Sequence, residues 1–169
     1  MTLPLKYLAA YSLDIQNKVQ EMISDKTLSA YLLAKYPTAH QIYNDKALRG
    51  YVLEIKNQYL KKSEPLSQIK YDDKIHVINN ALGLHTYISR IQGSKLKSKN
   101  EIRIGALFKK GPEKFLQMIV VHELAHLKEK DHNKNFYKLC EHMQNDYHQV
   151  ELDLRMYLTQ IELFGDIYQ

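Results

Sequence analysis

Apolar residues recur at helical spacing through the first third of the chain. The pattern predicts a helix over 12–24, which Ser12 caps, and a second over 27–36, which Pro37 ends. A third helix is predicted to begin near Asn44 or Asp45. Its apolar positions lie three and four residues apart at Leu48, Tyr51, Val52, Ile55 and Tyr59. Residues 1–62 are therefore expected to be largely helical.

The pattern changes to strict alternation in the middle of the chain. Residues 68–71, 85–89 and 101–104 alternate apolar and polar side chains, which predicts half-buried strands. The polar stretch 92–100 is interpreted as a hairpin loop between the last two. Residues 66–108 are therefore expected to form a small, mainly antiparallel sheet.

The last third returns to helical spacing. Pro112 suits a first helical turn, and the segment 113–130 is apolar on nearly all sides, which is typical of a buried helix. Asn133 is a suitable cap for a helix reaching about 145. A final helix is predicted over 148–164, with Gly165 ending it.

These elements predict an α+β fold in a single domain spanning 1–169. At 169 residues, with 44% hydrophobic and 25% charged residues, the chain is long enough to bury a core without disulfides. Its one cysteine, Cys140, excludes an intramolecular disulfide and fits a reducing compartment. No segment approaches the roughly 18 apolar residues of a membrane span, and no signal-peptide pattern is present, so we expect a cytoplasmic protein.

The predicted buried helix carries an H-E-x-x-H motif at His122, Glu123 and His126. Residues four apart lie on one helix face, so both imidazoles can reach one Zn²⁺. Glu123 lies next to the first ligand, where its carboxylate can take a proton from a zinc-bound water. The motif can also arise by chance. Burying two histidines and a glutamate in an apolar helix without a function would be costly, which favours the metal site.

A catalytic zinc needs a third protein ligand. His132 is the first choice, because it follows His126 by six residues, just past the predicted helix end. Metzincins use the same offset with a glycine turn between. This chain has Glu129 at that position, so Asp131 or Asn133 would have to provide a left-handed turn. Glu141 and Glu151 are rival ligands on the downstream helices.

Other residues near the motif have weaker predicted roles. His142 or Tyr137 is a candidate for stabilising an oxyanion. The remaining histidines have no ligand spacing and are interpreted as ordinary core or surface residues; they are His40, His76, His85 and His148.

Positive charge gathers just before the metal helix, although the formal net charge is only +5. The residues are Arg90, Lys95, Lys97, Lys99, Arg103, Lys109 and Lys110. They fit a solvated hairpin whose lysines protect a sheet edge. They also fit an anion-binding rim beside the metal cleft, in which Arg90, Lys95, Lys97, Lys99 and Arg103 would contact substrate.

The run IVVHELAHLKEKDHNKNFY resembles the YgjP-like zincin metallopeptidases, which are relatives of the SprT-like proteins. The resemblance extends over most of the chain, including IHVINNALGLHTYISRIQGSKLKSKNEIRIG. It implies a zincin-like fold and one zinc ion on His122, His126 and His132. Phe136 and Tyr137 stand where the family often has Phe-Trp.

Many relatives carry a Trp-Gly-Ser-Cys motif before the metal helix, but this chain contains no tryptophan. Its equivalent stretch is lysine-rich, which leaves the substrate open. The resemblance implies a metallopeptidase, or a UTP pyrophosphatase that forms UMP and pyrophosphate, since that activity has been linked with the YgjP name. A nucleic-acid-associated, SprT-like role is a third reading, although the sequence shows no base-reading motif or aromatic stacking array.

Overall fold

The computed structural model describes residues 5–75, 83–92 and 95–168, with the backbone alone for 83–92 and 95–99. The fold is α+β, as predicted. Along the chain the elements are η1 (Lys6–Leu8), α1 (Leu13–Asp25), α2 (Leu28–Lys35), α3 (Asp45–Tyr59), β1 (Gln68–Asp72), β2 (Gly83–Gln92), β3 (Lys95–Gly105), η2 (Ala106–Lys109), α4 (Glu113–Ala125), α5 (Lys134–Met143) and α6 (Tyr147–Phe164).

Side-chain caps fix the starts of the N-terminal helices where the sequence predicts them. Ser12 Oγ accepts a hydrogen bond from the Ile15 amide at 3.3 Å, and α1 follows. Asn44 Oδ1 accepts one from the Ala47 amide at 2.8 Å at the start of α3. Each cap satisfies a backbone N–H that the first helical turn leaves without a partner.

The sheet is mixed, with strand order β1-β3-β2. β2 and β3 form an antiparallel hairpin, as expected. The first strand departs from the expected antiparallel arrangement, because β1 runs parallel to β3 from Gln68 beside Glu101 to Asp72 beside Gly105. Alternation shows that one face of a strand is buried, but it carries no information about the direction of the neighbouring strand.

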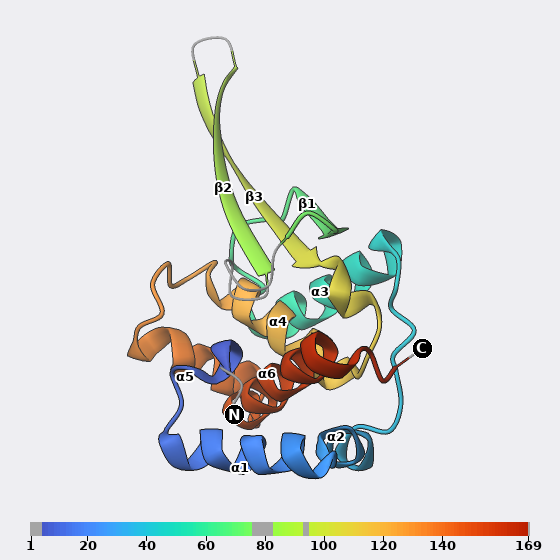
Figure 1. Cartoon of the computed structure of the whole chain (residues 1–169). Helices are drawn as coiled ribbons and strands as arrows, with labels where there is room; N and C mark the ends of the chain where they lie inside the picture. The colour runs from blue at the N-terminus through green and yellow to red at the C-terminus, as the bar shows by residue number, and fades with distance from the viewer. Residues whose placement is uncertain (1–4, 76–82, 93–94, 169) are drawn as a thin grey trace.

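The predicted hairpin loop over 92–100 is wrong for most of its length. β2 continues to Gln92 and β3 begins at Lys95, so Lys95–Asn100 is strand; residues 93–94 lie outside the described ranges. This distal half pairs only within the hairpin, because β1 reaches no further than Glu101, and it projects from the body of the protein (Figure 1). A projecting two-stranded ribbon has no core to face, so its sequence needs no apolar alternation.

Helix α4 lies in the middle of the molecule, packed against α3, α5 and α6 (Figure 1). Ten of its thirteen residues are buried, which confirms the buried helix predicted from its sequence. The predicted end near Lys130 is wrong, because α4 ends at Ala125 with His126 as its C-cap. The chain then turns, since the amides of Leu127 and Lys128 bond to carbonyls only three residues earlier.

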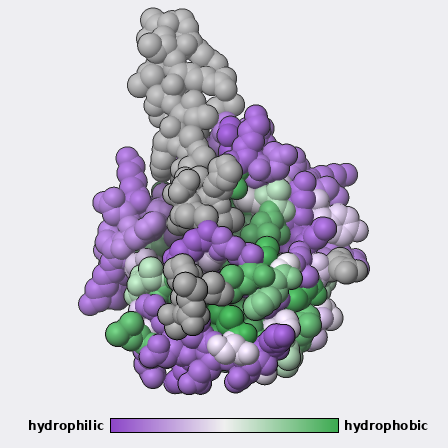
Figure 2. All heavy atoms as spheres, in the orientation of Figure 1, coloured by the Kyte–Doolittle hydropathy of each residue, from purple (hydrophilic) through white to green (hydrophobic). Residues whose placement is uncertain are grey.

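Polar residues surround this core. On the face drawn in Figure 2, hydrophilic residues predominate along the lower margin, where α1 lies, and along the upper left margin, where the connection before α5 lies. None of the helices within the described ranges combines the length and apolar character needed to cross a bilayer.

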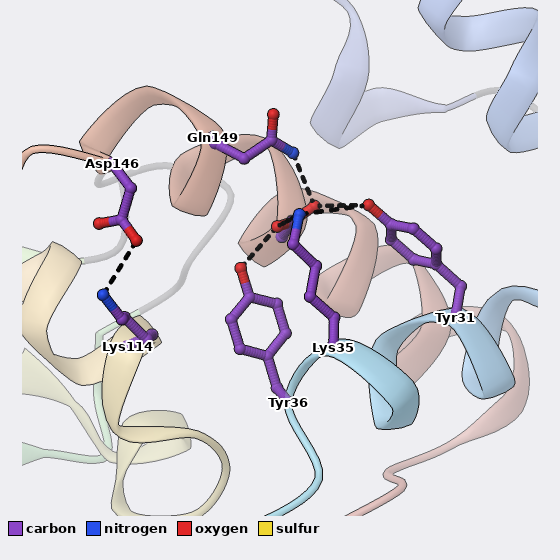
Figure 3. A network of polar contacts seen from close by, with 7 residues as sticks. Tyr31, Lys35, Tyr36, Lys114, Asp146 and Gln149 are labelled. Carbon is purple, nitrogen blue, oxygen red and sulfur yellow. Dashed lines mark hydrogen bonds and ion pairs between the residues drawn. The ribbon is translucent and has the colours of Figure 1, made fainter.

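A buried carboxylate joins the N-terminal helices to α6. Asp153 is 0% exposed. It accepts hydrogen bonds from Tyr36 Oη at 2.5 Å, Tyr31 Oη at 3.3 Å and Gln149 Nε2 at 3.2 Å, and it pairs with Lys35 Nζ at 2.7 Å (Figure 3). Three of these partners lie on α2 or its C-cap, so one carboxylate on α6 anchors the C-terminal part of α2.

Candidate metal centre

Three histidines meet where α4 ends. His122 lies on the last turn of α4, His126 caps it, and His132 lies in the connection to α5. One ring nitrogen from each lies within 4.8 Å of the other two, and in the described part of the chain these three form the group of His, Cys, Asp and Glu side chains close enough to share a metal ion. The structure thus brings together all three predicted ligands.

The imidazole of His122 is oriented by a hydrogen bond with a tyrosine. His122 is 6% exposed, and its Nδ1 lies 2.8 Å from Tyr147 Oη, on the first turn of α6. The hydroxyl can accept the Nδ1 proton, which leaves the lone pair of Nε2 available to a metal ion. Burial, with smaller contributions from His126, His132 and Arg155, lowers the pKa of His122 to about 3, so the imidazole is held in its neutral, metal-binding form.

His126 is oriented by the backbone that follows it. Its Nδ1 lies 2.9 Å from the carbonyl oxygen of Glu129, which can only accept, so Nδ1 carries the proton. Nε2 then presents a lone pair 3.1 Å from Nε2 of His132. This distance allows a hydrogen bond between the two rings, and it also suits two nitrogens that bind one cation at roughly 2.0–2.1 Å.

Phe136 supports all three imidazoles from one side. Its ring centroid lies 5.0 Å from that of His122, 4.6 Å from that of His126 and 4.9 Å from that of His132. Phe136 is placed by the start of α5, where its own amide donates to Asn133 Oδ1 at 2.8 Å. One capping bond therefore positions both the packing residue and the neighbouring His132.

Glu123 lies beside this cluster in an apolar surrounding. Its side chain is 2% exposed, and Oε2 has no hydrogen-bond partner among the described residues. Burial raises the pKa of Glu123 to about 8. A buried carboxylate oxygen without a partner is costly, unless a cation or an ordered water satisfies it. Together with three convergent imidazole nitrogens, this orphaned oxygen fits a divalent transition metal with a bound water.

The rival ligands are engaged elsewhere. Glu141 Oε1 pairs with His148 Nε2 at 2.8 Å, and Glu151 pairs loosely with Arg155 at 3.5 Å. Neither belongs to the histidine group. The geometry therefore favours His132 as the third ligand, which stays a prediction.

The expected left-handed turn before His132 is absent. In the described ranges the one non-glycine residue with positive φ is Lys26, so neither Asp131 nor Asn133 adopts that conformation. Asn133 has a φ of −90° and serves as the N-cap of α5. Because α4 ends early, at Ala125, the chain has room to turn without a glycine.

The two candidates for oxyanion stabilisation differ in position. The ring of Tyr137 lies 6.4 Å from that of His132. His142 instead packs against Tyr59, with the ring centroids 5.3 Å apart. Tyr137 is thus the one that borders the centre, and its role stays a prediction.

The predicted basic rim stays a prediction, because the structure describes one of its five side chains. Arg103 is paired with Asp72 and Glu101, at 3.4 Å each, so carboxylates already neutralise its charge. The side chains of the other four residues lie outside the described residues; these are Arg90, Lys95, Lys97 and Lys99. The backbone register pairs Arg90 with Lys97 on the projecting hairpin.

Sequence reasoning missed the residues that orient the ligands. Tyr147 contacts His122 across 25 residues of chain, and the Glu129 carbonyl is a backbone group that no motif reports. Phe136 was visible only as part of a family resemblance. Helical burial could have identified Tyr147 as a core residue, but not its hydrogen bond.

The comparisons with known proteins agree with this geometry. A family model described as "YgjP-like, metallopeptidase domain" matches residues 10–157. The chain belongs to the YgjP-like family. A protein of Escherichia coli (strain K12) named UTP pyrophosphatase is 52% identical over 159 residues, which cover 94% of this chain and 95% of the relative. No solved structure matches.

These findings identify this YgjP-like chain as a hydrolase. The family description refers to peptide hydrolysis, whereas the name of the relative refers to a nucleotide. The three close histidines agree with a metal site in either case.

Proposed function

We propose that this chain is a zinc-dependent pyrophosphatase that converts UTP to UMP and pyrophosphate. The observation that carries the proposal is the relative named UTP pyrophosphatase, which is 52% identical over nearly the whole of both chains. Identity at this level over the full length supports a shared reaction far better than a shared fold does. The histidine cluster supports the proposal, because it could hold the metal ion that would activate a water for such a reaction.

In this proposal His122, His126 and His132 hold one zinc ion through Nε2. When bound there, zinc would lower the pKa of a coordinated water and polarise the phosphate it contacts. Tyr147 and the Glu129 carbonyl keep the first two imidazoles in the correct tautomer. Phe136 shields one side of the ligands from solvent.

Glu123 is the proposed general base. Its unpartnered Oε2 takes the proton from the attacking water, while the new P–O bond forms and the α–β anhydride bond breaks. Pyrophosphate leaves with the bridging oxygen and its electron pair, and UMP keeps the α-phosphate. A buried carboxylate suits this task, because a raised pKa brings proton affinity close to neutral pH.

The test measures products from zinc-loaded protein and UTP. We expect UMP and pyrophosphate in equal amounts, and a fall in kcat of about 10²–10⁴ in Glu123→Gln, because general-base catalysis contributes that much. Glu141→Gln is the matched control, since its carboxylate pairs with His148 outside the cluster. UDP and orthophosphate as products, or an unchanged rate in Glu123→Gln, would contradict the proposal.

Peptide hydrolysis is the second candidate, and the family description favours it. Casein and a mixed peptide library should be incubated with the same preparations. Cleavage that is lost in Glu123→Gln, together with no turnover of UTP, would replace the nucleotide with a peptide substrate.

A further inference from the structure

A basic cavity lies beside the connection from α4 to α5, which carries His132, and the site described above does not use it. It has a volume of about 680 Å³ and lies between the connection from α3 to β1 and the connection from α4 to α5. The first wall includes Lys61, Lys62 and Glu64; the second includes Lys128 and Lys130. The volume is within the range of small-molecule sites, roughly 300–1,000 Å³.

The charged side chains that line this cavity are mainly positive. Four lysines and one glutamate line it. Glu64 Oε2 already accepts a hydrogen bond from Asn100 Nδ2 at 2.7 Å. Where side chains are described, Lys61, Lys62 and Lys128 are exposed and form no ion pair. Cations gathered in a concave wall repel one another and concentrate anions, so the cavity is suited to a ligand with several negative charges.

The second wall is continuous with the metal ligands. Lys128 follows His126 by two residues and Lys130 precedes His132 by two, so their Cα atoms lie within about 7.6 Å of a ligand's Cα. Glu129, between these lysines, supplies the carbonyl that orients His126. Hydrophilic residues cover this connection in Figure 2. The segment that forms this wall therefore also holds two of the three histidines.

We propose that this cavity binds the β- and γ-phosphates of the substrate, and then the pyrophosphate that leaves. The identity of the substrate rests on the proposed function, but the preference for a polyphosphate rests on the lysines. Two phosphates in the cavity bring the α–β bond to the histidines and leave the nucleoside outside it. This site differs from the predicted rim, because it involves none of the hairpin residues.

The test measures binding of inorganic pyrophosphate by calorimetry to the metal-stripped chain, so that chelation and turnover do not contribute. The triple variant Lys61→Ser, Lys62→Ser, Lys128→Ser is expected to bind at least about tenfold more weakly, since hydrogen bonds between charged groups are the strong ones. The matched control removes three exposed charges elsewhere, with Lys18→Ser, Lys26→Asn and Lys46→Ser. Its affinity should stay within about twofold.

The same variants separate this inference from the proposed function. The triple lysine variant is called the cavity variant. If wild-type protein hydrolyses UTP, and the cavity variant has the wild-type KM for UTP and the wild-type affinity for pyrophosphate, the cavity assignment is overturned and the proposed function stands. If UTP is not hydrolysed but pyrophosphate binding depends on the three lysines, the cavity stands and the function fails. Lys128→Ser alone provides a graded check should the triple variant be unstable.

A competition experiment distinguishes a free polyphosphate from the phosphates of a nucleic-acid backbone. A 12-nucleotide single-stranded DNA should compete with pyrophosphate only weakly if the cavity is shaped for a free polyphosphate. Competition at lower concentration than pyrophosphate itself, lost in the cavity variant, would overturn the assignment in favour of a nucleic-acid backbone.

Discussion

The two halves of the metal centre are held in different ways. His122 and Glu123 are buried on α4, and the packing of that helix against its neighbours fixes them. His132 is exposed, and local hydrogen bonds of the connection to α5 hold the chain around it: His126 to the Glu129 carbonyl, and Asn133 to Glu129 at 3.3 Å. The helical half is therefore built by the fold, whereas the other half depends on a short stretch of chain.

The largest expected effects come from removing one ligand in each half. His122→Ala and His132→Ala should each weaken zinc binding more than about 100-fold, beyond the usual effect of a residue that only orients a ligand. In the metal-free chain they should differ. His122→Ala leaves a buried cavity and should lower the free energy of unfolding by about 2 kcal/mol, whereas His132→Ala should change it by less than about 0.5 kcal/mol.

Urea unfolding with and without EDTA measures both quantities. Equal losses of metal-free stability in the two variants would show that the halves are not distinct. Zinc binding that survives His132→Ala would return the third-ligand role to a glutamate.

The next largest effect is expected from Tyr147, which forms a hydrogen bond with His122. Tyr147→Phe keeps the buried ring but removes the hydroxyl that lies 2.8 Å from Nδ1 of His122. We expect zinc affinity to fall about 10–100-fold, measured by competition with a chelating dye. Tyr137→Phe is the control, since its ring borders His132 without a hydrogen bond to a ligand among the described side chains. Similar losses in both variants would argue against orientation by Tyr147.

The smallest effect compares two helix caps of the same type. Asn133→Ala and Asn44→Ala each remove an amide oxygen that accepts at 2.8 Å, so each should lose about 1 kcal/mol of stability. Only Asn133→Ala should also weaken zinc binding, because its cap positions the exposed half of the centre. Titration of both variants with zinc checks this, and a shared effect would point to general destabilisation instead.

The same contrast explains what could be predicted from the sequence. Helical periodicity and capping are local, so the helices over 13–25, 45–59 and 113–125 and the ligand face at His122 and His126 were within reach. The parallel pairing of β1, the Tyr147 contact and the basic cavity depend on tertiary packing. Lys61 and Lys128 are 67 positions apart, and no single segment shows that they share a wall.

The buried carboxylate of Asp153 also limits how small a working enzyme can be made. Deleting the first two helices would strip Tyr31, Lys35 and Tyr36 from a fully buried negative charge on α6. That same helix presents Tyr147 to the metal centre. A fragment cut down to the segment that carries the histidines would thus leave the Asp153 carboxylate buried without its partners, on the helix that also carries Tyr147. We therefore expect that a minimal active fragment has to retain the N-terminal helices.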